Sequence, residues 1–498
     1  MIETQAPITI LIVPLFAAFA ISLFGRGRDH LSYSLLVMAM AGAGAASLVT
    51  LRAVLASGPI HYAVGGWPPP IGIELVVDHL AALVLVLVTG CALLTAIYSW
   101  RPARKQLPDR LHHYYTLFCL LVTGLAGMVA TGDAFNLYVL LEIAALSSYA
   151  MLASGRGHAY YATFKYIIMG TIGACFYLLG VGYLYIKTGT LNMADLHRLL
   201  AQPGLQDSIS IRIGFLLIMV GMGIKMAFFP LHGWLPNAYS RAATATGCLI
   251  APLMTKVAVY VMARMMFSVF SAGYVFETLP WRHGMVALAT VAIVAGSLRA
   301  LAQGSLRRTL AYIIVAEVGY MVGGLWLASP DGLVGALYHM VADGLMTLCL
   351  FMAVGAIVHR TGKSGIEAME GILARMPLTM AVFILGGLAV VGVPPTCGFF
   401  SKWYLLRGGI ASGQYHYVAA LIFSSLVHAV IFYRFLERAW YGGLSTQRHD
   451  EVASSAIQEA PASMLAPMLL VAGSLVVFGL YAGEIVSLFI RFNIPSGL

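Results

Sequence analysis

The chain has few charged residues. Only 10% of its 498 residues are Asp, Glu, Lys or Arg, whereas a typical soluble protein carries about 25%. The six cysteines form no CxxC pair, so we expect small buried thiols rather than disulfides or metal ligands. There is no GxGxxG, P-loop lysine or GxSxG motif, and the histidines lack metal-ligand spacing. The sequence therefore predicts no cofactor, no metal site and no hydrolytic nucleophile.

Apolar sequence is what the chain has in abundance: 60% of the residues are hydrophobic and the mean hydropathy is +0.87. A membrane-spanning helix needs about 20 mostly apolar residues. About 14 segments fulfil this, namely 5–24, 32–55, 77–99, 114–131, 134–153, 162–186, 211–229, 243–270, 284–303, 306–327, 332–358, 377–408, 415–440 and 464–490. We expect an all-α polytopic protein with a single membrane domain, residues 1–498, in the lipid bilayer. Acidic Glu3, without a basic segment before the first span, argues against a cleaved signal peptide.

The distribution of lysine and arginine predicts the orientation. Most of these residues lie in the odd-numbered connections between spans, and such connections face the cytoplasm. Both termini are then expected on the outer side. The net charge of +9 reflects this topology, because no basic tail or interleaved aromatic run supports nucleic-acid binding.

A small set of ionisable residues lies inside the apolar spans. They are Glu142, Lys225, Lys256, Glu317, His339 and Lys402. A charged side chain at the bilayer centre costs roughly 2.5–3.5 kcal/mol on insertion scales. Acids, lysines and histidine can each hold or release a proton, so this set indicates a proton path.

Glycine and proline interrupt two of the spans that carry a lysine. Lys225 lies between Gly221 and Pro236 in span seven, and Lys402 follows Gly392-Val393-Pro394-Pro395 in span twelve. Paired interrupted helices in two halves of a chain are the best sequence indication of a transport site. The alternative is a lysine that extends to the headgroups, but Lys402 is too far from a helix end for that.

The sequence leaves the partners of these residues open. Glu142 has no basic neighbour on its own helix, and Lys225 is its natural partner. Lys256 also lacks a partner on its own helix. His339 is either functional or a hydrogen-bonded core histidine, with Asp343 one turn later as a candidate partner. His232 follows the interruption of span seven, where a capping role is the alternative.

Internal symmetry predicts a second pair. Residues 114–270 (spans 4–8) and 284–440 (spans 9–13) resemble two copies of a five-helix unit, which an odd helix number would invert in the membrane. Glu142 and Lys225 are 83 residues apart, and Glu317 and Lys402 are 85 apart. Glu317 is therefore expected to pair with Lys402, giving two switches joined through Lys256 and His339. The alternative is that Glu317 pairs locally, with His339 or a backbone group.

His428 in span thirteen matches Lys256 in span eight under this symmetry. We therefore count His428 with Glu317, Asp343 and His232 among the additional candidates for proton transfer.

Several segments also carry a family resemblance. They are 65–73, 132–142, 164–166, 189–196, 230–236 and 392–402. In these segments the chain resembles the antiporter-like subunits shared by respiratory complex I and the Mrp-type cation/proton antiporters, and it is most similar to the D-type member of the Mrp antiporters. The resemblance implies that Glu142 pairs with Lys225, that Lys256 lies on a central hydrophilic axis, and that Lys402 lies toward the exit.

The chain departs from this family pattern at three positions. Asp343 and Thr347 stand where the family often has a second histidine and a lysine. Glu317 stands where the family usually has an uncharged polar residue. The contacts between the proton-transferring residues at the centre of the protein are therefore expected to differ from those in other members.

Three functions compete. The leading one is a proton-translocating subunit of a multi-subunit Mrp-type antiporter that exchanges protons for Na⁺ or K⁺ in a bacterial cytoplasmic (inner) membrane. The second is the proton-pumping arm of a redox complex, either an NADH:quinone oxidoreductase or a membrane-bound hydrogenase. The third is a purely structural membrane subunit, which the number of buried charges argues against. In each case other membrane subunits are the expected partners, and the chain has no catalytic centre of its own.

Overall fold

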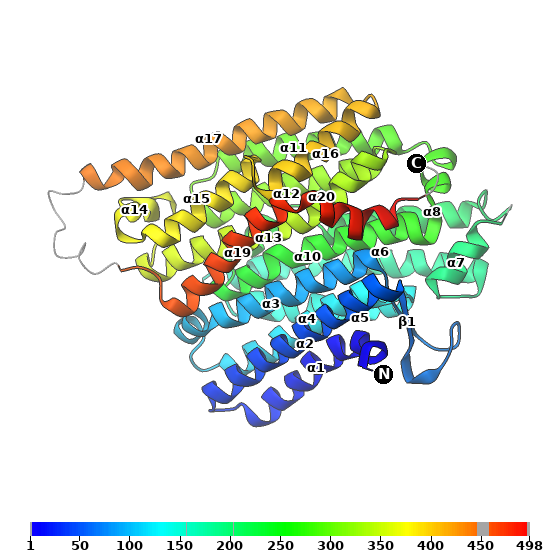
Figure 1. The fold of residues 1–498 in the computed structure, drawn as a ribbon, viewed down its shortest axis with the longest axis horizontal. Helices are drawn as coiled ribbons and strands as arrows, with labels where there is room; N and C mark the ends of the chain where they lie inside the picture. Colours follow the sequence, from blue (N-terminus) through cyan, green and yellow to red (C-terminus); the bar gives the residue numbers. More distant parts are fainter. Residues whose placement is uncertain (1, 156, 203, 446–457, 496–498) are drawn as a thin grey trace.

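The chain folds into a bundle of long, roughly parallel helices (Figure 1). The computed structural model describes all residues except 1, 156, 203, 446–457 and 496–498. Its α-helices are α1 (Ile2–Phe24), α2 (Asp29–Ser57), α3 (His79–Gln106), α4 (Leu111–Ala130), α5 (Ala134–Ala153), α6 (Ala159–Thr188), α7 (Met193–Leu200), α8 (Ile209–Lys225), α9 (Leu235–Arg241), α10 (Thr244–Arg264), α11 (Arg282–Leu301), α12 (Leu306–Trp326), α13 (Pro330–Thr361), α14 (Ile372–Arg375), α15 (Pro377–Val391), α16 (Cys397–Ala411), α17 (Tyr415–Ser445), α19 (Ala462–Leu480) and α20 (Ala482–Ile485). Short 3-10 or π segments are η1 (Val64–Gly66), η2 (Met265–Phe270), η3 (Tyr274–Thr278), η4 (Ile366–Met369), η5 (Val486–Ile490) and η6 (Arg491–Asn493).

Twelve helices in the described part of the chain are long and apolar enough to cross a membrane. The all-α membrane fold expected from the sequence is therefore confirmed. The expected span twelve (377–408) is divided into α15 and α16, and the helix of the expected span seven (211–229) ends at Lys225 as α8, with the short α9 after it. The division agrees with the glycine and proline positions. Because each half is shorter than a full span, the number of fourteen remains a prediction.

Helices α10, α12 and α13 form the centre of the bundle. Nearly every residue of their membrane-spanning windows is buried. The outer helices α1, α2, α6, α11 and α19 bury only about a third of theirs, so their remaining apolar side chains cover the surface. Such a surface is the one that lipid or neighbouring subunits require.

One end of the bundle carries a small two-stranded hairpin. Strands β1 (Ile60–Ala63) and β2 (Glu74–Val77) pair antiparallel, with Ile60 opposite Val77. The N–H of Gly132, between α4 and α5, donates to the carbonyl of Glu74 at 2.8 Å. The start of α1, the hairpin, α7 and the end of the described chain all lie at this end, whereas α14 lies at the other (Figure 1).

Polar side chains cap the helices that begin at this end. The Asp133 carboxylate accepts from the N–H groups of Phe135 and Asn136 at the start of α5, and the Asn192 side chain accepts from Asp195 at the start of α7. A cap of this kind satisfies N–H groups that have no partner within the helix. These caps fix where α5, which carries Glu142, begins.

One prediction about the cysteines is wrong in part. Five of the six are buried as expected, but Cys175 on α6 is exposed. Helix α6 is a peripheral helix with one face turned outward, and apolar residues of the same helix such as Ile172 and Leu179 are exposed beside it. Composition alone does not show which face of a span lies outward.

Close packing of α15 against α16 depends on Gly398. A methyl group at this position would lie 1.9 Å from the main-chain oxygen of Ala389. We expect Gly398→Ala to lower the thermal unfolding midpoint of the purified protein, since overpacking typically costs about 1–3 kcal/mol. The matched control is Gly473→Ala on α19, where the added methyl meets no atom within 4 Å. Equal midpoints for the two variants would contradict this account of the α15–α16 contact.

Candidate functional site

The buried ionisable residues form three contacts between helices. The first joins α5 and α8: Nζ of Lys225 lies 3.4 Å from Oε1 of Glu142. The Lys225 side chain is 6% exposed and that of Glu142 is 24% exposed, so the lysine is the more enclosed partner. Lys225 is the last residue of α8, and the contact expected from the sequence is present.

The second contact joins α10 and α13. Nζ of Lys256 lies 2.8 Å from Oδ2 of Asp343, and both side chains are almost fully buried. Thr347 lies one turn beyond Asp343 and donates to its Oδ1 at 2.8 Å, and Lys256 lies 3.4 Å from the same hydroxyl. Two of the three positions that depart from the family pattern, Asp343 and Thr347, are therefore the ones that hold Lys256.

This arrangement corrects the suggestion that Asp343 pairs with His339. The two residues are one turn apart on α13, but Asp343 contacts α10 and His339 contacts α12. The physical reason is that a buried ammonium needs a carboxylate more than an imidazole does. Because Lys256 has no acidic neighbour on its own helix, it takes Asp343.

The third contact joins α12, α13 and α17. Nε2 of His339 lies 2.5 Å from Oε2 of Glu317, and Nδ1 of His428 lies 3.7 Å from Oε1 of the same carboxylate. The other ring nitrogen of His339 is 2.8 Å from Oγ of Ser401. The side chains of Glu317, His339 and His428 are completely buried. We call these three residues the Glu317 cluster.

The expected ion pair between Glu317 and Lys402 is therefore wrong, and the local alternative with His339 is what the structure contains. Lys402 donates instead to the carbonyls of Val390 and Val391, at 2.6 and 3.4 Å, and to Oγ of Ser425 at 3.0 Å. The interruption between α15 and α16 exposes these carbonyls, and they satisfy the ammonium without a carboxylate. Any proton transfer between Glu317 and Lys402 would therefore pass through polar neighbours such as Ser401.

His232 belongs to none of these contacts. It lies in the turn between α8 and α9, where its carbonyl accepts from the N–H of Leu235 at 3.1 Å. Its ring stacks on Phe229, and its Nδ1 is buried without a hydrogen-bond partner among the described residues. This position agrees better with the capping alternative than with a direct place in the proton path.

Sequence reasoning missed a further ion pair and the polar side chains around Lys402. Arg264 at the end of α10 forms an ion pair with Asp78, the cap of α3, and its Nε donates to Oη of Tyr260 at 2.8 Å. Both charges stand at helix ends, so nothing in the apolar pattern singled them out. Ser401 and Ser425 were missed because single serines are common in apolar helices.

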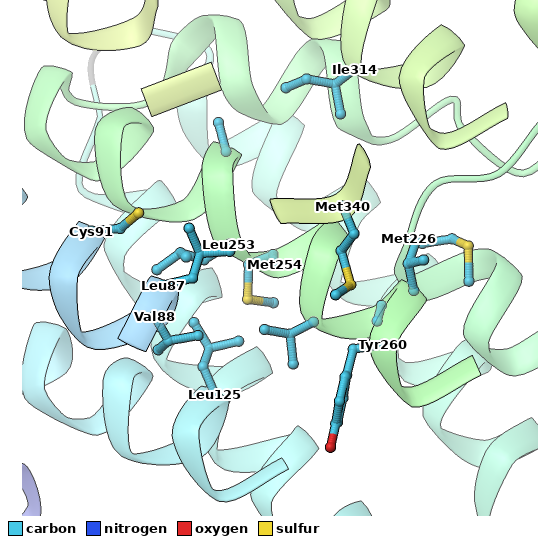
Figure 2. Packing of buried hydrophobic residues seen from close by; sticks show 14 of the residues in the cluster. Leu87, Val88, Cys91, Leu125, Met226, Leu253, Met254, Tyr260, Ile314 and Met340 are labelled. Atoms are coloured by element: carbon cyan, nitrogen blue, oxygen red, sulfur yellow. The ribbon is translucent and has the colours of Figure 1, made fainter. Parts of the chain in front are cut away.

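Apolar side chains pack around α10. Figure 2 shows Leu253 and Met254 of α10 among Leu87, Val88 and Leu125, with Met226 and Met340 nearby. Met226 follows Lys225 in sequence and Met340 follows His339. Protons do not cross apolar packing of this kind without water.

Residues 131–427 match the model of the NADH:quinone oxidoreductase/Mrp antiporter transmembrane family. The chain belongs to this family. The matched range contains Glu142, Lys225, Lys256 and Lys402, together with the whole Glu317 cluster apart from His428. The buried contacts described above are therefore, with that one exception, contacts between residues of the family region.

The relatives of this family member come from two kinds of assembly. NADH-quinone oxidoreductase subunit N of Desulforudis audaxviator is 43% identical over 497 residues, which is 98% of each chain. The D-type subunit of the Na(+)/H(+) antiporter of Bacillus subtilis is 31% identical over 395 residues, covering 79% of this chain and 78% of the relative.

Two solved structures share the fold of this family member. A chain of the archaeal membrane-bound sulfane sulfur reductase is 30% identical, with a TM-score of 0.89 and coverage of 98% of this chain and 97% of its own. A chain of the Mrp complex of Dietzia is 23% identical, with a TM-score of 0.88 and coverage of 99% and 97%. The chain is thus a membrane protein of the antiporter-like class, whose homologues are subunits of multi-subunit complexes.

The Lys256–Asp343 contact should contribute to the stability of the folded protein. Asp343→Asn should leave a buried ammonium without its counter-charge and lower the free energy of unfolding by about 3–5 kcal/mol. The double variant Lys256→Met with Asp343→Leu removes both charges, so we expect it to recover most of that loss. Thermal unfolding in detergent measures both.

The control for this prediction is Asp207→Asn, which breaks the exposed 3.2 Å pair with Arg212. A surface pair contributes about 0–1 kcal/mol, so its midpoint should hardly move. If Asp343→Asn were as stable as Asp207→Asn, Asp343 would not be the counter-charge of Lys256.

Proposed function

We propose that this chain is the proton-translocating subunit of a multi-subunit Mrp-type antiporter that exchanges protons for a monovalent cation. The observation that carries the proposal is the set of buried ionisable contacts described above, from Glu142 and Lys225 through Lys256 and Asp343 to the Glu317 cluster and Lys402. Buried ionisable residues in a membrane protein are costly and mark ion pathways. A structural subunit has no use for them.

The Glu142–Lys225 contact works as the entry switch in this proposal. A carboxylate at 3.4 Å favours the charged ammonium, and separation of the two in an apolar surrounding favours the neutral amine. Opening the contact therefore releases a proton from Lys225, and closing it takes one up. Lys256 and His339 carry the proton onward, with Asp343 and Glu317 as their respective counter-charges.

The repeats and the orientation are part of the same proposal. Residues 114–270 and 284–440 are the two inverted units, so the interrupted helices α8 and α15 hold equivalent places. The chain lies in a bacterial inner membrane with both termini outside. The position of α1 and of the end of the described chain at one end of the bundle supports this topology (Figure 1).

A redox-driven proton pump is the second candidate. The 43% identity with an NADH-quinone oxidoreductase subunit N and the 30% identity with a chain of the sulfane sulfur reductase favour it. Affinity purification from native membranes separates the two candidates. Copurifying small membrane subunits support the antiporter, whereas iron–sulfur subunits support the redox complex.

Lys225→Arg tests the switch directly. Arginine keeps the positive charge beside Glu142 but is not deprotonated in proteins. We expect an assembly of normal composition in which cation-dependent proton movement falls at least about tenfold. The reason is that an arginine at position 225 keeps its proton and cannot pass it to the next residue. Proton movement is followed with a pH-sensitive dye in inverted membrane vesicles.

The control is Asp195→Asn, which removes the exposed 3.1 Å contact with Arg198 on α7 and should leave proton movement unchanged. Glu142→Gln serves as the partner variant and should match Lys225→Arg. Near-normal transport in an intact Lys225→Arg assembly would refute the switch.

A further expectation concerns the isolated chain. Homologues of this protein are subunits of larger assemblies, and the contacts described above contain no source of energy. Purified alone and reconstituted into liposomes, the chain should therefore show no coupled exchange of cation and proton above that of empty liposomes. The complete assembly in the same liposomes is the positive control, and robust exchange by the single chain would contradict the proposal.

A further inference from the structure

A cavity of about 300 Å³ lies where the C-terminal end of α3 meets the C-terminal end of α13. Its lining consists of Trp100, Arg101, Arg104, Lys105 and His359. Nζ of Lys105 donates to the carbonyl of His359 at 3.1 Å, which joins the two helices beside the cavity. Ligand sites in proteins measure about 300–1,000 Å³, so this cavity suits a small group such as a phosphate ester.

The positive charges around this cavity are poorly neutralised. The nearest carboxylate oxygen, Oδ2 of Asp29, lies 3.9 Å from Nε of Arg104. No carboxylate of the described residues lies within 4 Å of Arg101 or Lys105. Nδ1 of His359 is buried and has no hydrogen-bond partner among the same residues. An anion with several acceptor oxygens would supply the partners that these donors lack.

The cavity lies at the depth of the lipid headgroups. The expected spans 77–99 and 332–358 end immediately before Trp100 and His359, and tryptophan is enriched at the boundary between membrane and water. The Trp100 ring packs against His30 and Tyr33 of α2, with centroids 4.9 and 4.7 Å apart. The guanidinium of Arg104 lies 5.3 Å from the centroid of the same ring. The positive charges are thus held at the membrane boundary by an aromatic support.

An apolar groove along α3 leads to this cavity. Between residues 80 and 100 the half-buried positions of α3 are Val86, Gly90, Leu93, Leu94, Ile97 and Trp100, and all the others are buried. Their spacing of three and four residues places them on one face of the helix. Helices α2 and α19 both pack against α3, which lies between them (Figure 1). A methyl group added at Gly90 would meet no atom within 4 Å, so the groove is open at that point.

The groove is long enough for an acyl chain. At 1.5 Å per residue, the distance along α3 from Val86 to Trp100 is about 21 Å. The hydrocarbon of one leaflet is about 15 Å thick, half of the bilayer core. An acyl chain that starts at the cavity would therefore lie on this face of α3 over its whole length.

We propose that the cavity and the α3 groove together bind one anionic phospholipid. Its phosphate lies against Arg101, Arg104 and Lys105, and one acyl chain lies on the face of α3 that carries Gly90. A soluble phosphate ester offers the same oxygens but would leave the apolar groove uncovered, so the lipid is the occupant that fits both parts. The bound headgroup would bridge α3 and α13, the helix of His339 and Asp343. This inference does not rest on the proposed function.

Positive charge at the end of a membrane helix is not sufficient for such a site. Arg434 and Arg438 are also exposed, near the C-terminal end of α17. Arg434 donates to the carbonyl of Leu301, the last residue of α11, at 3.0 Å, much as Lys105 donates to His359. The cavity beside Arg434 has a volume of only about 10 Å³. These two arginines therefore provide a matched control.

Equilibrium binding of tritiated dioleoylphosphatidylglycerol to the purified, delipidated assembly in dodecyl maltoside micelles tests the site. The wild type should bind this lipid more tightly than dioleoylphosphatidylcholine, and salt should weaken the binding. A basic residue near anionic lipid contributes about fivefold to affinity. Arg101→Gln combined with Arg104→Gln should therefore weaken binding about 25-fold, whereas Arg434→Gln combined with Arg438→Gln should leave it unchanged. Equal affinities of the two double variants would overturn the site.

Gly90→Leu tests the groove separately from the charges. The new side chain occupies the open part of the α3 face, so phosphatidylglycerol binding should weaken at least threefold while the thermal unfolding midpoint of the lipid-free assembly does not fall. The control is Gly182→Leu on α6, another half-buried glycine with no atom within 4 Å of an added methyl group. Wild-type affinity in Gly90→Leu would overturn the acyl-chain position.

Glycerol 3-phosphate distinguishes a lipid from a soluble ligand. At millimolar concentration it should not displace the tritiated phosphatidylglycerol, because it makes no contact with the groove. Displacement by glycerol 3-phosphate would assign the cavity to a soluble phosphate ester and overturn the lipid. Equal binding of phosphatidylglycerol and phosphatidylcholine by the wild type would overturn recognition by charge.

Discussion

Every positive charge and every main-chain oxygen inside a bilayer must find its partner within the protein. The three buried lysines meet this requirement in three ways. Lys225 uses the carboxylate of Glu142, Lys256 uses Asp343 with Thr347, and Lys402 uses the carbonyls left free by two prolines. Each partner lies on a different helix from its lysine, so each lysine also fixes how two helices pack. The contacts that neutralise the buried lysines are therefore also contacts that hold the helices together.

Helix α13 joins the two halves of the arrangement. His339 and Asp343 stand one turn apart but contact α12 and α10 respectively, so a small rotation of α13 would alter both contacts together. Apolar side chains that include Met226 and Met340 pack together near α10 (Figure 2). Methionine is unbranched and adapts readily to changed packing. Side chains of this kind suit a proton path that must admit water only briefly.

The sequence predicted the helical membrane fold, both interrupted helices and the Glu142–Lys225 contact, because apolar length, proline and an isolated charge each act locally. For Glu317 it left two partners open, Lys402 and His339, of which His339 is present, and it did not predict that Asp343 pairs with Lys256. Spacing along the chain placed Glu317 with Lys402, but the side on which each helix faces its neighbours depends on packing. One signal was available: Pro394 and Pro395 stand four residues after Val390 and Val391, which marks the two carbonyls that receive Lys402.

Helix α15 connects the Lys402 position with one end of the bundle. Fifteen residues at about 1.5 Å each span about 22 Å. Glu459 binds the N-terminus of α15, and the main-chain oxygen of Glu459 accepts from Arg360 near the end of α13 at 2.5 Å. A displacement of this segment by a neighbouring protein would therefore act on α15 and α13 at once. Because one helix carries the Lys402 carbonyls and the other carries His339 and Asp343, a single contact outside the membrane core can reach all three groups.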